Sequence, residues 1–220
     1  MKWDQTNRLD LAPTSLLGVE DSEYARTALK WWMVQAVRRI YKPGSPAKYI
    51  LVLEGAQDIG KSTFLRTLCG DQWFSDSPLH VGTLAGQLGL AGTWIQELAE
   101  GAILRKADEA ELKAYIGQNS DKFQRKFANE NSVVPRQTVF AMSINPKSGG
   151  YLHDSTGNVR YWPVLCTKVD FDALVRDRDQ LWAEAVHLYQ QGLIPEPRRM
   201  RRRSYSVSRS GTARSSRCGR

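Results

Sequence analysis

One eight-residue stretch constrains the fold of this 220-residue chain more than any other. Residues 55–62, Gly-Ala-Gln-Asp-Ile-Gly-Lys-Ser, match the pattern of a phosphate-binding loop, in which backbone N–H groups turn inward around a polyphosphate. An apolar run of strand-forming residues, 49–53, precedes it, and residues 63–69 suit a helix that Gly70 would end. Strand, glycine loop and helix in this order predict a nucleotide-binding unit, and the alternative is a coincidental glycine turn.

The loop pattern also assigns chemistry to individual side chains. Lys61 would reach the β- and γ-phosphates of ATP as a point charge, and the Ser62 hydroxyl would take a coordination position on Mg²⁺. The other expected contacts to the nucleotide are Gly55, Gln57, Gly60 and Thr63.

Composition places the chain among globular proteins. Hydrophobic residues make up 41% of it, and its length suits a single domain with a real core. No apolar run approaches the ~18 residues that span a bilayer, and the first residues lack the apolar region of a signal peptide. We therefore expect a cytoplasmic protein without a membrane partner. The scattered Cys69, Cys166 and Cys218 predict neither a disulfide framework nor a zinc site.

The net charge of +8 comes from one end of the chain. Residues 198–220 hold nine arginines and no acid, which leaves 22 of the 31 basic residues against all 23 acidic ones. Such a tail is predicted to be disordered. It would either bind nucleic acid by neutralising phosphate charge, or represent a non-native end from a shifted reading frame or a truncated gene.

The order of elements predicts an α/β protein. Residues 1–20 are expected to be irregular and residues 71–92 loop-like. Helices are expected over 21–41, 108–116 and 171–191, and further strands over 93–98, 138–144 and 161–165. Alternating strands and helices favour a mostly parallel central sheet with flanking helices, a three-layer arrangement. The chain would divide into a helical segment (1–44), a nucleotide-binding core (45–192) and the disordered tail (193–220).

An enzyme that hydrolyses ATP needs more than a phosphate loop. Glu97 closes one expected strand, where its carboxylate would order metal-bound water, and Glu100 would orient or activate the attacking water. Asn145 ends another strand, where its amide would hold that water or sense the γ-phosphate. Arg160, in a polar loop, would reach the γ-phosphate of a neighbouring subunit as an arginine finger. Taken singly, these residues also fit solvated surface groups, a turn before Pro146 and a surface salt bridge.

Together these motifs resemble the virulence-associated protein E family. The resemblance is carried by Leu-Glu-Gly-x-Gln-x-x-Gly-Lys-Ser-Thr-Phe, Trp-Ile-x-Glu-Leu-x-Glu, Asn, and Asp-x-Thr-Gly-Asn-x-Arg-Tyr-Trp-Pro-Val in this order. It runs from about Asp10 to Gly192, and it takes in residues 8–10 and 177–182. Members are phage- and plasmid-borne P-loop ATPases similar to superfamily 3 helicases, within the AAA+ group. The resemblance implies an AAA+-like fold, a homo-oligomeric ring, and ATP-driven work on DNA in replication of a mobile element, usually with a primase.

The resemblance also implies a contact to single-stranded DNA through a basic and aromatic stretch at residues 121–127. Lys122, Arg125 and Lys126 interleave with Phe123 and Phe127 there, which suits phosphate contact combined with base stacking. The alternative is an exposed hairpin with a solvated charged face.

Three positions depart from the family pattern. Asp58 stands where the family commonly has Gly, Val159 where it usually has Arg, and Gln124 where it has a basic residue. They keep a second hypothesis open, a truncated or decayed prophage remnant that binds nucleotide or DNA without efficient turnover. A third, a small-molecule kinase, is disfavoured because the sequence shows no lid-like arginine cluster.

Overall fold

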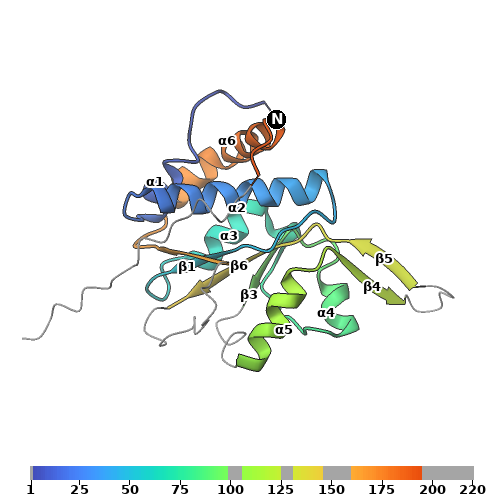
Figure 1. Cartoon of the computed structure of the whole chain (residues 1–220). Coiled ribbons are helices and arrows are strands. Elements are labelled where there is room, and N and C mark those ends of the chain that lie inside the picture. Colours follow the sequence, from blue (N-terminus) through green and yellow to red (C-terminus); the bar gives the residue numbers. More distant parts are fainter. Residues whose placement is uncertain (1, 99–105, 125–130, 146–159, 195–220) are drawn as a thin grey trace, which may run out of the picture.

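The computed structural model describes residues 2–98, 106–124, 131–145 and 160–194. In this part of the chain a five-stranded sheet lies between two layers of helices (Figure 1). Every neighbouring pair of its strands is parallel. The strand order is β2 (Phe74–Ser75), β3 (Ile95–Leu98), β6 (Val139–Ile144), β1 (Ile50–Glu54) and β7 (Tyr161–Leu165). The predicted three-layer α/β fold with a mostly parallel sheet is therefore confirmed.

The central strands are apolar on both faces, which explains why helices cover both. In β1, Leu51 and Leu53 pack into one core, while Ile50 and Val52 pack into the other. Successive side chains of a strand point to opposite faces, so an unbroken apolar run fits a strand buried on both sides. One face is covered by α1 (Ala12–Leu17), α2 (Glu23–Tyr41), α3 (Lys61–Cys69) and α6 (Phe171–Gln190), and the other by α4 (Leu84–Gly89) and α5 (Lys106–Ile116).

The long helix α2 forms close to where its sequence predicts. It begins after Ser22, whose hydroxyl accepts a hydrogen bond from the Ala25 N–H at 3.1 Å and so caps the helix. The apolar side chains of α2 from Leu29 to Val37 are buried, whereas Ile40 near its end stays 40% exposed. The Trp32 indole donates to the carbonyl of Phe140 at 2.9 Å, so α2 is fixed directly to the sheet.

The sequence suggested that residues 1–20 are irregular, but part of this segment forms a helix. Helix α1 forms around Pro13, because proline in the first turn of a helix loses no intrahelical hydrogen bond. Gly18 ends α1 in a left-handed conformation, with φ of 60°. Pro13 and Gly18, residue types that often break regular structure, are here the start and stop signals of a short helix.

The expectation of a loop over residues 71–92 is also wrong in part. The segment contains a short 3₁₀ helix (η1, Asp71–Trp73), the edge strand β2 and helix α4. The Thr83 hydroxyl accepts from the Gly86 N–H at 3.1 Å and caps α4. Gly86 must be small, since a Cβ there would lie 2.0 Å from the carbonyl oxygen of His80. Gly86 thus serves close packing within a segment that was expected to be a loop.

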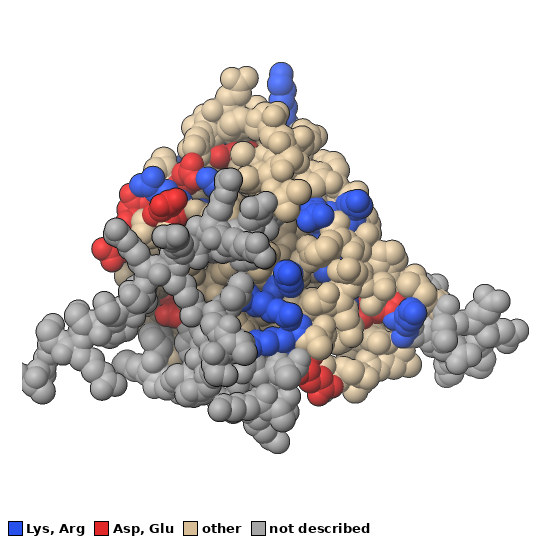
Figure 2. Space-filling view, in the orientation of Figure 1, with Lys and Arg blue, Asp and Glu red and all other residues tan. Residues whose placement is uncertain are grey.

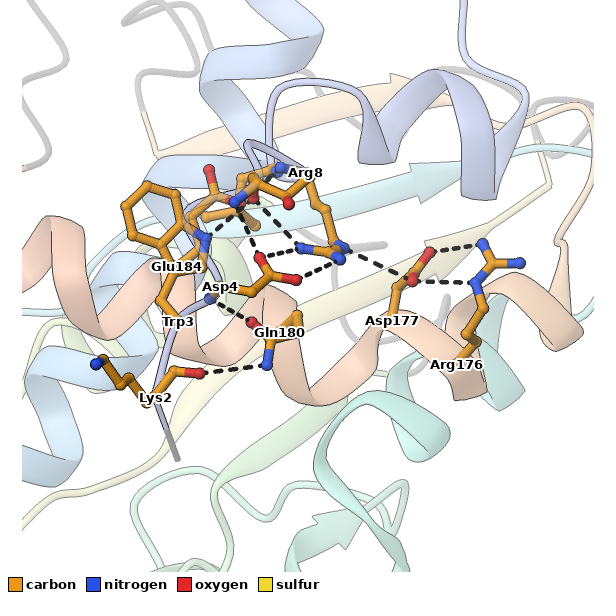
Figure 3. Close-up of polar contacts among 10 residues, drawn as sticks. Lys2, Trp3, Asp4, Arg8, Arg176, Asp177, Gln180 and Glu184 are labelled. Atoms are coloured by element: carbon orange, nitrogen blue, oxygen red, sulfur yellow. Dashed lines mark hydrogen bonds and ion pairs between the residues drawn. The ribbon is translucent and has the colours of Figure 1, made fainter.

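Two sequence motifs from opposite ends of the chain lie side by side in Figure 3. The backbone N–H groups of Arg8 and Leu9 donate to one carboxylate oxygen of Glu184 in α6, at 2.7 and 3.0 Å. The Arg8 guanidinium bonds Asp4 and lies 3.7 Å from Asp177 of α6. Burial raises the pKa of Glu184. These contacts tie the N-terminal segment to the last helix.

A hairpin of β4 (Ser120–Gln124) and β5 (Asn131–Pro135) projects from the main body (Figure 1). Its base is held by Arg136, which forms a bidentate ion pair with Asp121 at 2.7 and 2.5 Å. Both side chains are buried, and the guanidinium also lies 4.1 Å above the ring of Tyr115. Arg39 of α2 donates to the carbonyls of Arg136 and Gln118, so the hairpin base is joined to the core. Burial, and then the nearby charge of Arg136, lowers the pKa of Arg39 to about 10.

No helix in the described part of the chain is both long and apolar enough to cross a membrane.

Candidate functional site

The glycine loop connects β1 to α3 in the order that the sequence predicts. Gly60 adopts φ of 92°, and a Cβ there would lie 2.5 Å from the ring of Phe171. Gly55 is equally constrained, because its Cβ would lie 2.5 Å from the carbonyl oxygen of Cys166. The loop is therefore packed closely against the chain that follows β7, and both of its glycines are required by its shape.

Asp58 occupies the tip of this loop with φ of 62°. This left-handed conformation favours glycine, and Asp is one of the few other residues that tolerate it. The loop thus keeps its turn despite the departure from Gly, at the expense of an exposed carboxylate beside the pocket.

Lys61 is the first residue of α3 and is almost fully buried. Its ammonium donates to the carbonyl oxygens of Gly55 and Ala56 at 3.0 and 2.6 Å. The charge is therefore held within the loop, next to the backbone that a phosphate would approach.

Ser62 links the loop to the neighbouring strands. Its hydroxyl donates to Oε1 of Glu97 at 2.8 Å, which brings together the two residues expected to bind Mg²⁺. The hydroxyl of Ser143, in β6, donates to the same carboxylate oxygen and lies 3.2 Å from the hydroxyl of Ser62. Glu97 is only 6% exposed, and its Oε2 has no hydrogen-bond partner among the described residues. A site of hydroxyl and carboxylate oxygens suits a hard divalent cation.

An open pocket of about 700 Å³ lies over the loop and the carboxyl end of β6. The predicted residues that line it are Gln57, Gly60, Lys61, Ser62, Thr63 and Asn145. Its volume falls within the usual range of ligand sites. The pocket lies at the carboxyl edge of a parallel sheet, where open α/β proteins bind their ligands.

Ser143 was not expected from the sequence. It lines the pocket two residues before Asn145 and contacts both Ser62 and Glu97. The available signal was a single hydroxyl in the otherwise apolar strand Val-Phe-Ala-Met-Ser-Ile. Position 143 shares its side of β6 with position 145 because side chains alternate along a strand.

Arg160 lies at the opposite edge of the sheet. It precedes β7, and its carbonyl accepts from the N–H of Ile50, the first residue of β1. The glycine loop follows the other end of β1. The length of this five-residue strand, at about 3.3 Å per residue, therefore separates Arg160 from the loop. Its guanidinium donates to the carbonyl of Lys113 in α5. Arg160 therefore lies at the other end of β1 from the pocket of its own chain, and its role as an arginine finger stays a prediction.

The other predicted site residues are covered only in part. Glu100 lies outside the described residues, as do Arg125, Lys126 and Val159. Lys122 is exposed on β4, whereas Phe123 is described only by its place in that strand. The hairpin itself forms, and its contact with DNA remains a prediction.

Basic side chains gather near the middle of one face of the molecule, shown in blue in Figure 2. The net charge of residues 1–197 is close to zero, with 22 basic and 23 acidic residues. This face nevertheless carries a local group of positive side chains.

Cys166 has a buried thiol and lies next to the glycine loop. Burial raises the pKa of Cys166 to about 12, so the thiol stays protonated at neutral pH and is a poor nucleophile.

The loop, the sheet order and the position of the pocket define a three-layer α/β fold of the P-loop kind. The model of the virulence-associated protein E-like domain matches residues 1–210, and the chain belongs to this family. The match extends past Gly192, where the resemblance was expected to end. No curated protein matches the chain significantly.

Two solved structures of the NrS-1 C-terminal region resemble the fold. The A-form apo structure of this region has a TM-score of 0.56 at 14% identity, covering 89% of this chain and 46% of that one. A further apo structure has a TM-score of 0.52 at 14% identity, with coverages of 82% and 45%. At such low identity the likeness concerns the fold alone. The chain spans less than half the length of these structures.

Proposed function

We propose that this chain is a helicase-like domain that binds ATP with Mg²⁺ at the glycine loop and hydrolyses it. Its work would be on single-stranded DNA in the replication of a phage or another mobile element. The observation that carries the proposal is the 2.8 Å bond between Ser62 and Glu97, which joins the phosphate loop to an acidic strand end beside the pocket. Membership of the virulence-associated protein E-like family supports the same conclusion.

The described residues divide the work of such a site among them. The Lys61 ammonium would exchange its loop carbonyls for phosphate oxygens, and the N–H groups at the start of α3 would face the same anion. Ser62 and Glu97 would hold the cation, which when bound would draw charge from the phosphates. Asn145, on the pocket wall, would position the attacking water.

Hydrolysis would require a second copy of the chain. Arg160 lies at the far edge of the sheet from its own pocket, so its charge would act on the γ-phosphate held by a neighbour. We propose a homo-oligomeric ring as the arrangement that repeats this contact.

The test is ATP hydrolysis by the full chain with and without single-stranded DNA. We expect hydrolysis that DNA stimulates and that Lys61→Ala abolishes. Equal rates in Lys61→Ala and the unaltered chain would contradict the assignment of the loop.

A second candidate function is that of a remnant that binds nucleotide without efficient turnover. Asp58 favours it, since its exposed carboxylate stands beside the pocket that would receive a polyphosphate. Nucleotide binding without hydrolysis in any condition would support this candidate over the first.

A further inference from the structure

Two hydroxyls and one carboxylate oxygen meet at the wall of the pocket. Ser62 Oγ lies 2.8 Å from Glu97 Oε1, Ser143 Oγ donates to the same oxygen, and the two hydroxyl oxygens are 3.2 Å apart. Each hydroxyl has one hydrogen and two lone pairs, whereas an ionised carboxylate only accepts. Glu97 therefore draws both hydrogens towards itself, whether directly or through the other serine. Lone pairs on both serine oxygens remain for a further partner.

This cluster leaves one oxygen of a buried carboxylate unused. Glu97 is 6% exposed, its Oε2 has no hydrogen-bond partner among the described residues, and no described Lys or Arg forms an ion pair with it. Lys61, the residue before Ser62, donates to loop carbonyls instead. A carboxylate buried without a partner is costly when it is ionised, and a cation bound at this wall of the pocket would compensate its charge.

We propose that Ser143 is a second hydroxyl ligand of the divalent cation in this pocket, next to Ser62, with Glu97 orienting both hydroxyls. The inference rests on the proposed function for the presence of a cation there. Both serines line the pocket. Their oxygen separation of 3.2 Å is close to the roughly 3 Å between adjacent ligands of an octahedral cation with bonds of about 2.0–2.1 Å. The sequence pattern assigns only Ser62 and Glu97 to the metal, so Ser143 adds a ligand from a third element, β6.

The proposal predicts a change in cation affinity that is separable from nucleotide affinity. Free Mn²⁺ is measured by electron paramagnetic resonance with the full chain and a saturating non-hydrolysable ATP analogue. Ser143→Ala should weaken Mn²⁺ binding roughly 10- to 100-fold, while affinity for the analogue in EDTA stays unchanged. Ser143→Thr, which keeps a hydroxyl, should restore most of the affinity. Ser77→Ala, at an exposed serine, is the matched control and should behave as the unaltered chain.

A swap of ligand chemistry tells direct coordination from a packing role. Ser143→Cys replaces the oxygen with sulfur, so the site should lose Mn²⁺ and gain affinity for a soft cation such as Cd²⁺. A residue that only supports Glu97 would show no such change of preference.

The outcomes separate this inference from the proposed function. If the unaltered chain binds the analogue with Mn²⁺, but Ser143→Ala binds Mn²⁺ equally well and Ser143→Cys gains no Cd²⁺ affinity, Ser143 is not a ligand and the proposed function stands. If the unaltered chain binds neither the analogue nor Mn²⁺, the proposed function fails and the role of Ser143 falls with it.

Discussion

The two edges of the central sheet carry opposite chemistry. At the carboxyl edge, the hydroxyls of Ser62 and Ser143 and the carboxylate of Glu97 border an open pocket. At the amino edge, before β6 and β7, the guanidiniums of Arg136 and Arg160 donate to backbone carbonyls. At the carboxyl edge, Glu97 Oε2 has no hydrogen-bond partner among the described residues. At the amino edge, both guanidiniums are bonded to backbone carbonyls of the same chain.

The edges also differ in how much of them local sequence reveals. The phosphate loop is one contiguous motif with its own glycines. Each arginine of the amino edge is instead bonded to the backbone of another element, as Arg160 is to the Lys113 carbonyl and Arg136 to that of Tyr115. The loop could thus be found by reading a motif, whereas the contacts of Ser143 and of the two arginines could be seen only after folding.

The largest effect is expected at Arg160, the amino-edge arginine to which we assign a role in a neighbouring site. Arg160→Ala should lower the rate of ATP hydrolysis by roughly 10³–10⁵-fold and leave ATP affinity unchanged, because the arginine would act on the transition state. The checks are steady-state hydrolysis and equilibrium binding on the same preparation.

Mixing two variants tests whether Arg160 acts between chains. Arg160→Ala and Lys61→Ala are each expected to be inactive, but a mixed assembly would contain pockets with both an intact loop and an intact arginine. Partial recovery of hydrolysis is the expected result. Full activity of Arg160→Ala alone would show that Arg160, like Arg136, has a structural role and no role in hydrolysis.

The next effect is on stability, at the base of the hairpin. Arg136→Ala would leave Asp121 buried and unpaired, which should lower the free energy of unfolding by about 3–5 kcal/mol. Chemical denaturation measures this directly. The double variant Arg136→Met with Asp121→Leu strands no charge and should lose much less. A single variant as stable as the unaltered chain would show that this pair does not hold the hairpin.

The smallest effect is expected at Asp58, on the carboxyl edge. Removing its charge should raise ATP affinity by roughly tenfold, since a carboxylate about 6 Å from a phosphate repels it even after screening. Asp58→Asn removes the charge and still tolerates the left-handed backbone, while Asp58→Gly also relieves the strain. Similar gains in both variants would identify charge as the cause, and no gain in either would show that the loop accommodates Asp.

Much of the fold could be predicted because its signals are local. The apolar run of β1, the glycines that bound the loop and the Ser22 cap of α2 each act within a few residues. The predictions failed where one residue type serves two purposes. Pro13 starts α1 and Gly86 lets α4 pack, although both suggested loops in the sequence.

The candidate site also contains residues that the sequence predicted and one that it did not. Lys61, Ser62 and Glu97 were predicted and come together, because parallel strands bring their carboxyl ends to one edge. Ser143 was missed, because a lone hydroxyl in an apolar strand points to the pocket only once β6 is placed between β1 and β3. The parallel direction of β7 beside β1 places Arg160 at the amino edge, whereas its bond to the Lys113 carbonyl in α5 could not be read from the sequence.

We propose that the glycine-loop edge binds a nucleoside triphosphate, which calorimetric titration with ATP and Mg²⁺ measures. We predict that the unaltered chain binds ATP, that Lys61→Ala weakens binding at least about tenfold by removing a charge-assisted phosphate contact, and that the exposed control Lys42→Ala binds normally. Equal ATP affinity of Lys61→Ala and the unaltered chain, or no ATP binding by either, would contradict it.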